Sequence, residues 1–173
     1  MSTLKINNFN TVAGVAYNSI VQAKHFTHTT VESFTLGDAV PYDTNLKLSI
    51  KPLFANSQIL LIASVCTFYV PDVSVMRIRF KRTPFTTLSP AGNASGGYSV
   101  WTAVSYAQAN SWGNSMTPNS EIYWMDSPAS TGEVVYTCQL SGNNASATVG
   151  LNRYTHNSVW SGSSHLTLLE IAQ

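Results

Sequence analysis

Few residues in this chain could perform acid–base or metal chemistry, and the four histidines are the first to consider. They are His25, His28, His156 and His165, and only the first two are close in sequence. A separation of three residues makes side chains neighbours on a helix but places them on opposite faces of a β-strand. Glu32 is the only acid near this pair. We therefore expect histidines at a surface or an interface and no metal site.

The sequence also lacks the common patterns of nucleophilic and phosphate chemistry. Many serines are present, but residues 159–163 and the other serine-containing segments do not form a Gly-x-Ser-x-Gly elbow leading into a helix. The glycine-rich residues 92–97 lack the following lysine and helix of a nucleotide loop. Glycoside cleavage needs two facing carboxylates, and the eight acids are scattered singly, so only folding could pair them. We expect no enzymatic activity and no cofactor.

One cluster of basic residues stands out, in residues 77–82. On a strand, Arg77, Arg79 and Lys81 would share one face, with Ile78 and Phe80 on the other. Two interpretations stay open for the basic face: it is solvated, or it contacts an acidic patch on a partner subunit, for which arginine is well suited. Nucleic acid is disfavoured, because base stacking needs aromatic residues on the same face. The formal net charge of +1 also gives no long-range attraction to a polyanion.

Two tryptophans differ from the other aromatic residues, most of which we expect in the core. Trp112 and Trp160 each lie in a stretch of Ser, Asn and Gly, where no strand pattern draws them inward. An exposed tryptophan can anchor a protein contact or stack on a sugar ring. Both are candidate contact residues.

Alternating apolar and polar residues, punctuated by turn residues, predict an all-β domain. The expected strands are 20–26, 32–36, 46–50, 59–69, 75–81, 98–107, 121–125, 134–140, 147–153 and 165–171. About ten strands in one domain indicate a sandwich or a barrel. Residues 59–65 are continuously apolar, so we expect a central strand covered on both faces, by the second sheet and by a loop or another subunit.

Turn chemistry predicts loops at 89–97, 109–118 and 127–132, and the Asn-rich residues 1–18 read as an arm before the domain of residues 19–173. Leu4, Lys5, Ile6 and Phe9 are the candidate contact residues of this arm. Its short alternating piece could add a strand to a neighbour's sheet or pair within its own domain, and both alternatives stay open.

The composition favours assembly with other subunits. Only 10% of the 173 residues are charged, while 44% are hydrophobic. The surface must therefore be built from neutral Asn, Ser, Thr and Gln, and weak charge repulsion permits contact between copies. Cys66 and Cys138 lie in apolar runs and are expected to be buried free thiols. With no apolar run long enough for a membrane span and no secretory signal, the chain reads as made in the cytosol.

Three segments carry a resemblance to a known family. They are the opening residues 1–8, the turn 125–130 followed by the strand 134–138, and the ending 163–172. Together they resemble small virion proteins of tailed bacteriophages, especially phages of cyanobacteria and marine bacteria. The resemblance implies a jelly-roll-like antiparallel β-sandwich, a homotrimer and a place on the virion exterior. It carries no catalytic residues.

Within that class, two functions must be separated. A capsid decoration or cement protein needs only a short arm and a compact domain, whereas the receptor-binding head of a tail fibre normally follows a long shaft. Residues 1–18 leave no room for such a shaft, so we expect a decoration protein. The expected partners are further copies of the chain and the major capsid protein or another virion protein. A host-surface glycan and a carbohydrate-binding module stay open as alternatives; nucleic acid and membrane insertion are not expected.

Overall fold

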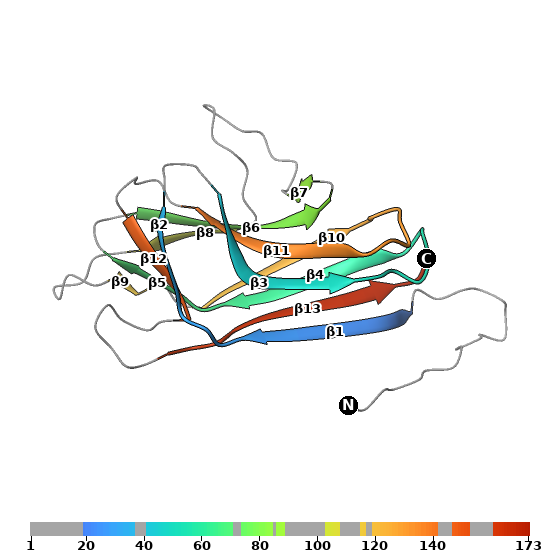
Figure 1. The fold of residues 1–173 in the computed structure, drawn as a ribbon, viewed down its shortest axis with the longest axis horizontal. Helices are drawn as coiled ribbons and strands as arrows, with labels where there is room; N and C mark the ends of the chain where they lie inside the picture. The colour runs from blue at the N-terminus through green and yellow to red at the C-terminus, as the bar shows by residue number, and fades with distance from the viewer. Residues whose placement is uncertain are drawn as a thin grey trace.

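The computed structural model describes residues 19–36, 41–70, 74–84, 86–88, 103–107, 115–116, 119–141, 147–152 and 161–173. All regular structure in these residues is β-strand, which confirms the predicted all-β class (Figure 1). No helix in these ranges is long and apolar enough to cross a membrane. The strands are β1 (Ile20–His28), β2 (Glu32–Leu36), β3 (Tyr42–Ile50), β4 (Gln58–Val65), β5 (Thr67–Val70), β6 (Ser74–Thr83), β7 (Thr86–Leu88), β8 (Ala103–Ala107), β9 (Ser115–Met116), β10 (Ser120–Asp126), β11 (Val134–Ser141), β12 (Ala147–Leu151) and β13 (Ser164–Ile171).

Two antiparallel sheets form the sandwich. The β4 sheet has the order β1-β13-β4-β10, and the β11 sheet has the order β3-β11-β6, with both β7 and β8 pairing with β6. Along the chain, the long strands alternate between the two sheets, so neighbours in one sheet are far apart in sequence (Figure 1). This interleaved order is that of a jelly roll. It confirms the predicted jelly-roll-like sandwich.

The third sheet, with the order β2-β12-β5-β9, continues the four strands of the β4 sheet beyond a break. Asn152, buried and in the left-handed region at φ 61°, lies at this break. Its backbone N–H donates to the carbonyl of Cys66 at 2.8 Å, and its side-chain amide donates to the carbonyls of His28 and Thr30 at 2.8 and 3.0 Å. Its amide oxygen accepts from the Ser164 hydroxyl at 2.6 Å. Asparagine tolerates this backbone conformation, so one residue can tie three interrupted strands together through its side chain and its backbone N–H.

The hydrophobic core lies between the two long sheets, as the alternation of each strand requires. In β4, Ile59, Leu61, Ala63 and Val65 are fully buried, whereas the residues between them are half-buried on the outer side. From the β11 sheet, Phe80 and the inward side chains of β11 pack against them. Each fully buried aliphatic side chain contributes about 1.5–3 kcal/mol, so this layer is the main source of stability.

A buried ion pair also joins the two sheets, at their β6–β10 edge. Asp126 on β10 accepts from the Arg82 guanidinium at 2.9 and 2.7 Å and from the Tyr136 hydroxyl at 2.7 Å. Burial, followed by the bond to Asp126, raises the pKa of Tyr136, which therefore stays a neutral donor. Removing one member of such a network would leave its partners buried without compensation.

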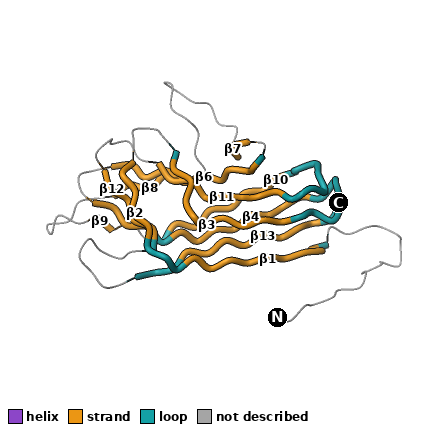
Figure 2. Tube along the Cα trace, in the orientation of Figure 1, coloured by secondary structure: helices purple, strands orange, loops and turns teal. Residues whose placement is uncertain are grey.

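The loop between β3 and β4 closes one end of the sandwich. Glu170 faces inward and is fully buried, and it accepts from the backbone N–H groups of Leu53 and Phe54 at 2.7 and 3.3 Å. Figure 2 shows this loop in teal at the end of the sheets beside the C-terminus. The outer ends of the sheets are thus fixed by hydrogen bonds as well as by packing.

Most of the predicted strands are confirmed, with three differences. The expected strand 59–69 is two strands, β4 and β5, because the N–H of Cys66 donates to the Ser164 hydroxyl and its carbonyl accepts from Asn152. The expected loop 109–118 contains β9, which pairs with β5 through its backbone. The strand β7 was not predicted; it pairs with the edge of β6. The loop at 127–132 is confirmed, whereas residues 98–102 and 153 of two expected strands, the loop 89–97 and the arm 1–18 lie outside the described residues.

Candidate functional site

The outer surface of the β4 sheet presents a row of apolar side chains. Directly opposed residues of antiparallel strands point to the same side. Leu60 lies between Leu169 and Met125, and Ile62 lies beside Tyr123. Tyr123 and Met125 are 56% and 42% exposed, and the other three are half-buried. We call these five residues the apolar face.

The expectation for β4 is confirmed for its inner face and for its place in the sheet. Its inner face is fully covered, and its central position between β13 and β10 is confirmed. Its outer residues Leu60 and Ile62 are covered only in part within the described portion of the chain. Cover by another subunit stays a prediction.

Two histidines meet beside the apolar face. The rings of His25 on β1 and His165 on β13 stack with their centroids 5.6 Å apart. The Thr27 hydroxyl lies 3.1 Å from His25 Nε2 and 3.1 Å from His165 Nδ1, and Thr167 Oγ1 lies 2.9 Å from His25 Nδ1. A hydroxyl has one hydrogen, so at least one of the two ring nitrogens donates to Thr27. The pair is a polar element of the outer surface.

His28 has a different role from His25, as the strand spacing predicts. His28 is buried on the opposite side of β1 and contacts the carboxylate of Glu32. Both Glu32 oxygens also accept from the backbone N–H of Asn45, at 3.2 and 3.3 Å. Glu32 and His28 thus connect the turn between β1 and β2 with the edge of β3. In the described residues, no three potential ligands from His, Cys, Asp and Glu come close enough to hold a metal.

On the β11 sheet, the predicted arrangement of β6 is confirmed. Ile78 and Phe80 are fully buried in the core, and Arg77, Arg79 and Lys81 are half-buried on the outer surface. The strand alternation alone determines this division.

Two of these basic side chains are held by partners on the neighbouring strands. Lys81 forms an ion pair with Asp43 at 2.6 Å, and Arg79 Nε donates to Gln139 at 2.8 Å. The Gln139 amide in turn donates to Asp43 at 2.5 Å. Burial raises the pKa of Asp43, but the bonds from Lys81 and Gln139 and the charges of Lys81 and Arg79 outweigh it, so the pKa lies below its ordinary value. Burial lowers the pKa of Arg79, and Asp43 acts in the opposite direction.

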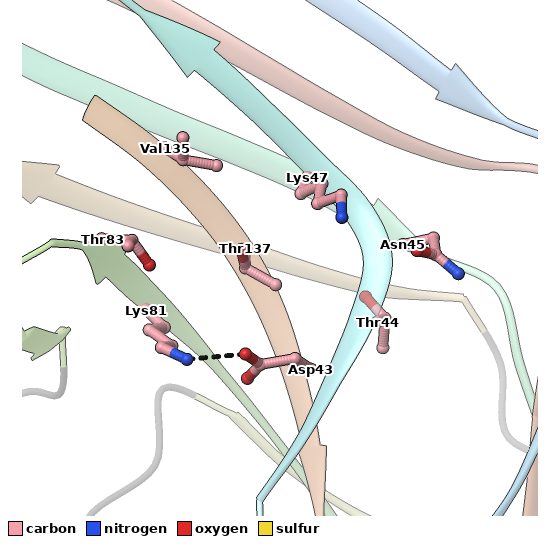
Figure 3. Close-up of a pocket in the computed structure, with 8 residues that line it drawn as sticks. All are labelled: Asp43, Thr44, Asn45, Lys47, Lys81, Thr83, Val135 and Thr137. Atoms are coloured by element: carbon pink, nitrogen blue, oxygen red, sulfur yellow. Dashed lines mark hydrogen bonds and ion pairs between the residues drawn. The ribbon is translucent and has the colours of Figure 1, made fainter. Parts of the chain in front are cut away.

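A groove of about 390 Å³ crosses this outer surface (Figure 3). It is lined by residues of β3, β11 and β6: Asp43, Thr44, Asn45, Lys47, Lys81, Thr83, Val135 and Thr137. In the close-up, Lys81 and Asp43 reach toward each other over β11, and Lys47 projects from β3. We call this the polar groove.

The remaining sequence candidates fall in other places. Leu4, Lys5, Ile6, Phe9, Trp112 and Trp160 lie outside the described residues. Cys66 and Cys138 are free thiols, as predicted; burial raises the pKa of both, that of Cys138 to about 12. Cys138 is fully buried, whereas Cys66 is only half-buried, because it lies at the break between β4 and β5.

Sequence reasoning missed most of the residues that build these two surfaces. Asp43 lies before the expected strand 46–50, because β3 begins at Tyr42, and Lys47 lies within that strand as an ordinary polar residue. Tyr123 is one of the aromatic residues most of which were expected in the core. The continuous apolar character of residues 59–65 was the one signal for the apolar face. Both surfaces are suited to binding.

No protein-family model matches the sequence, and a search of curated proteins finds no match either.

Proposed function

We propose that the chain is a non-catalytic structural subunit of the virion surface of a tailed phage, and that its copies associate through the apolar face. The single observation that carries the proposal is the exposure of Tyr123 and Met125 beside Leu60 and Ile62, on a sheet whose inner side is already filled by the core. Apolar side chains that lie together on an exposed face and are bordered by polar residues, as here by Glu121 and His165, mark interaction sites.

The charge of this face supports a further copy of the chain as its partner. Among the outward-facing residues of β1, β13, β4 and β10, Glu121 is the one carboxylate, and no Lys or Arg accompanies it there. Such a face has little to offer a strongly charged partner. Copies around a three-fold axis would each bury it, and the low charge of the chain keeps their repulsion weak.

The place on the virion rests on the resemblance of residues 1–8, 125–130, 134–138 and 163–172 to phage virion proteins, and the jelly-roll order agrees with it. On the virion, we propose that the chain decorates the capsid, with the arm 1–18 as the attachment segment. A tail-fibre head is the alternative.

The experiment that tests the place is an image of the phage particle with the protein labelled by an antibody. We expect label on the head, at positions of local three-fold symmetry. Label confined to the tail would overturn decoration in favour of the fibre head, and absence of label from intact particles would overturn the virion role.

A second experiment tests the arm. Deleting residues 2–16 should leave the domain folded and associated but abolish its attachment to particles, because apolar residues such as Leu4 and Ile6 contribute about 1.5–3 kcal/mol each when fully buried. A melting curve and a particle-binding assay on the truncated protein check both parts. Normal binding would show that the arm is not the tether.

A further inference from the structure

The polar groove lies on the side of the sandwich opposite the apolar face, and its charge is unbalanced. Its two lysines, Lys47 and Lys81, are both opposed to Thr137 of the central strand, one from each side. Asp43 is the sole acid in the lining. Its carboxylate is already engaged by Lys81 and Gln139.

Asp43 pairs with Lys81, so the charge of Lys47 is not balanced by a carboxylate of the groove. Lys47 is exposed, and it forms no ion pair with any residue in the described part of the chain. Arg79 and Arg77 lie two and four residues before Lys81 on β6, so their side chains add positive charge to the same outer surface. The surface therefore favours a negatively charged ligand.

The lining also restricts the kind of anion. Asn45 and Thr83 are exposed and supply an amide and a hydroxyl group, whereas Thr44 is buried and its hydroxyl donates to the Cys138 carbonyl at 2.8 Å. Val135 is the only aliphatic residue among the eight. Small-molecule sites are usually lined by apolar side chains, so this groove suits a ligand covered with hydroxyl groups. Its volume of about 390 Å³ lies at the small end of such sites.

Lysine rather than arginine lines the groove. An ammonium is a compact point charge that can bind a single anionic group such as a carboxylate. A hollow of hydroxyl, amide and ammonium groups differs from the flat surface on which an acidic protein patch would dock. The combination of one carboxylate and many hydroxyls is that of a sugar acid.

We propose that the polar groove binds a carboxylated saccharide unit, with the ammonium of Lys47 on the carboxylate and the exposed side chains of Asn45 and Thr83 on the sugar hydroxyls. The site is separate from the apolar face, so it goes beyond the proposed function and can succeed or fail independently of it.

Calorimetric titration of the full-length protein with a galacturonic acid trisaccharide tests this site, and the methyl ester of the same trisaccharide is the matched neutral ligand. We expect the acid to bind and the ester not to bind. Absence of binding by the acid at millimolar concentration, or equal binding of the ester, would overturn the proposal. A glutamate tripeptide that binds as tightly as the sugar acid would also overturn it, in favour of an acidic protein partner.

Three variants locate the binding. Lys47→Ala should weaken it by about tenfold, the effect of losing one charged hydrogen bond. Lys51→Ala removes the same charge just beyond the end of β3, outside the lining, and should change binding little. Asp43→Asn removes the competing carboxylate and should tighten binding, a gain that misfolding cannot produce. An equal loss in Lys47→Ala and Lys51→Ala, or weaker binding in Asp43→Asn, would show that the groove is not the site.

Discussion

The two outer surfaces of the sandwich follow the same alternation over the same core, yet their chemistry is opposite. The outer surface of the β4 sheet carries Leu60, Ile62 and Leu169, with Glu121 as its one carboxylate. The outer surface of the β11 sheet carries four cations and the carboxylate of Asp43. The inward residues thus determine the fold, and the outward residues are free to give one surface an apolar contact and the other a polar groove.

The largest effect is expected where the two sheets are joined. Asp126→Ala would leave the Arg82 guanidinium and the Tyr136 hydroxyl buried without their partner, which should cost about 3–5 kcal/mol in the free energy of unfolding. The two outer surfaces belong to the two sheets that this network joins. The variant should therefore weaken binding at the apolar face and at the polar groove together. Urea unfolding measures the loss.

The matched control on the outside is Asp43→Ala. It breaks an ion pair in which the side chains of Lys81 and Asp43 are 36% and 48% exposed, so it should cost less than about 1 kcal/mol. Equal costs for the two variants would show that the Asp126 network does not hold the sheets together.

The next largest effect is expected on self-association, when a negative charge is placed on one outer surface or on the other. Ile62→Asp puts a carboxylate in the middle of the apolar face and should weaken self-association by about a hundredfold, because the charge would be buried without a partner. Thr83→Asp puts it at the exposed end of β6 and should leave association unchanged. Sedimentation across a range of concentrations measures both. Equal weakening by the two variants would remove the distinction between the surfaces.

A smaller effect is expected from acid on the β11 sheet. The pKa of Asp43 in the folded protein lies below its ordinary value of 3.8. A lowered carboxyl pKa contributes stability that is present above the unfolded value and lost as the pH falls through the folded value. Asp43→Asn should therefore lower the melting temperature slightly at neutral pH, with the difference disappearing in acid. A difference that grew in acid would contradict the assignment.

The smallest effect lies on the β4 sheet, at alkaline pH. The hydrogen bond to Glu121, together with the charge of that carboxylate, raises the pKa of Tyr123 above its ordinary value of 10.0. A raised pKa contributes stability that is present below the unfolded value and lost as the pH rises through the folded value. The absorbance titration of the protein minus that of Tyr123→Phe should show one phenol ionising later than a free tyrosine. An ordinary titration would mean that the bond to Glu121 does not persist in solution.

The sequence allowed the fold class to be predicted, because a period of two residues reveals which side of a strand is buried. For the same reason, the division of Arg77, Arg79 and Lys81 from Ile78 and Phe80 was predicted correctly. The partners of these cations could not be predicted, since the contact between Lys81 and Asp43 depends on the order β3-β11-β6.

The same limit applies to the histidines. Their spacing in sequence showed that His25 and His28 lie on opposite faces, but the stacking of His25 on His165 requires the register of β1 against β13. Local alternation specifies the face of a residue, whereas strand order and register specify its neighbours.

The central claim is that the apolar face joins copies of this chain. Light scattering on the purified full-length protein at micromolar concentration tests it most directly. We predict a mass three times the 18.8 kDa of one chain, almost independent of salt because apolar burial holds the copies together. A mass of one chain at that concentration would contradict the claim.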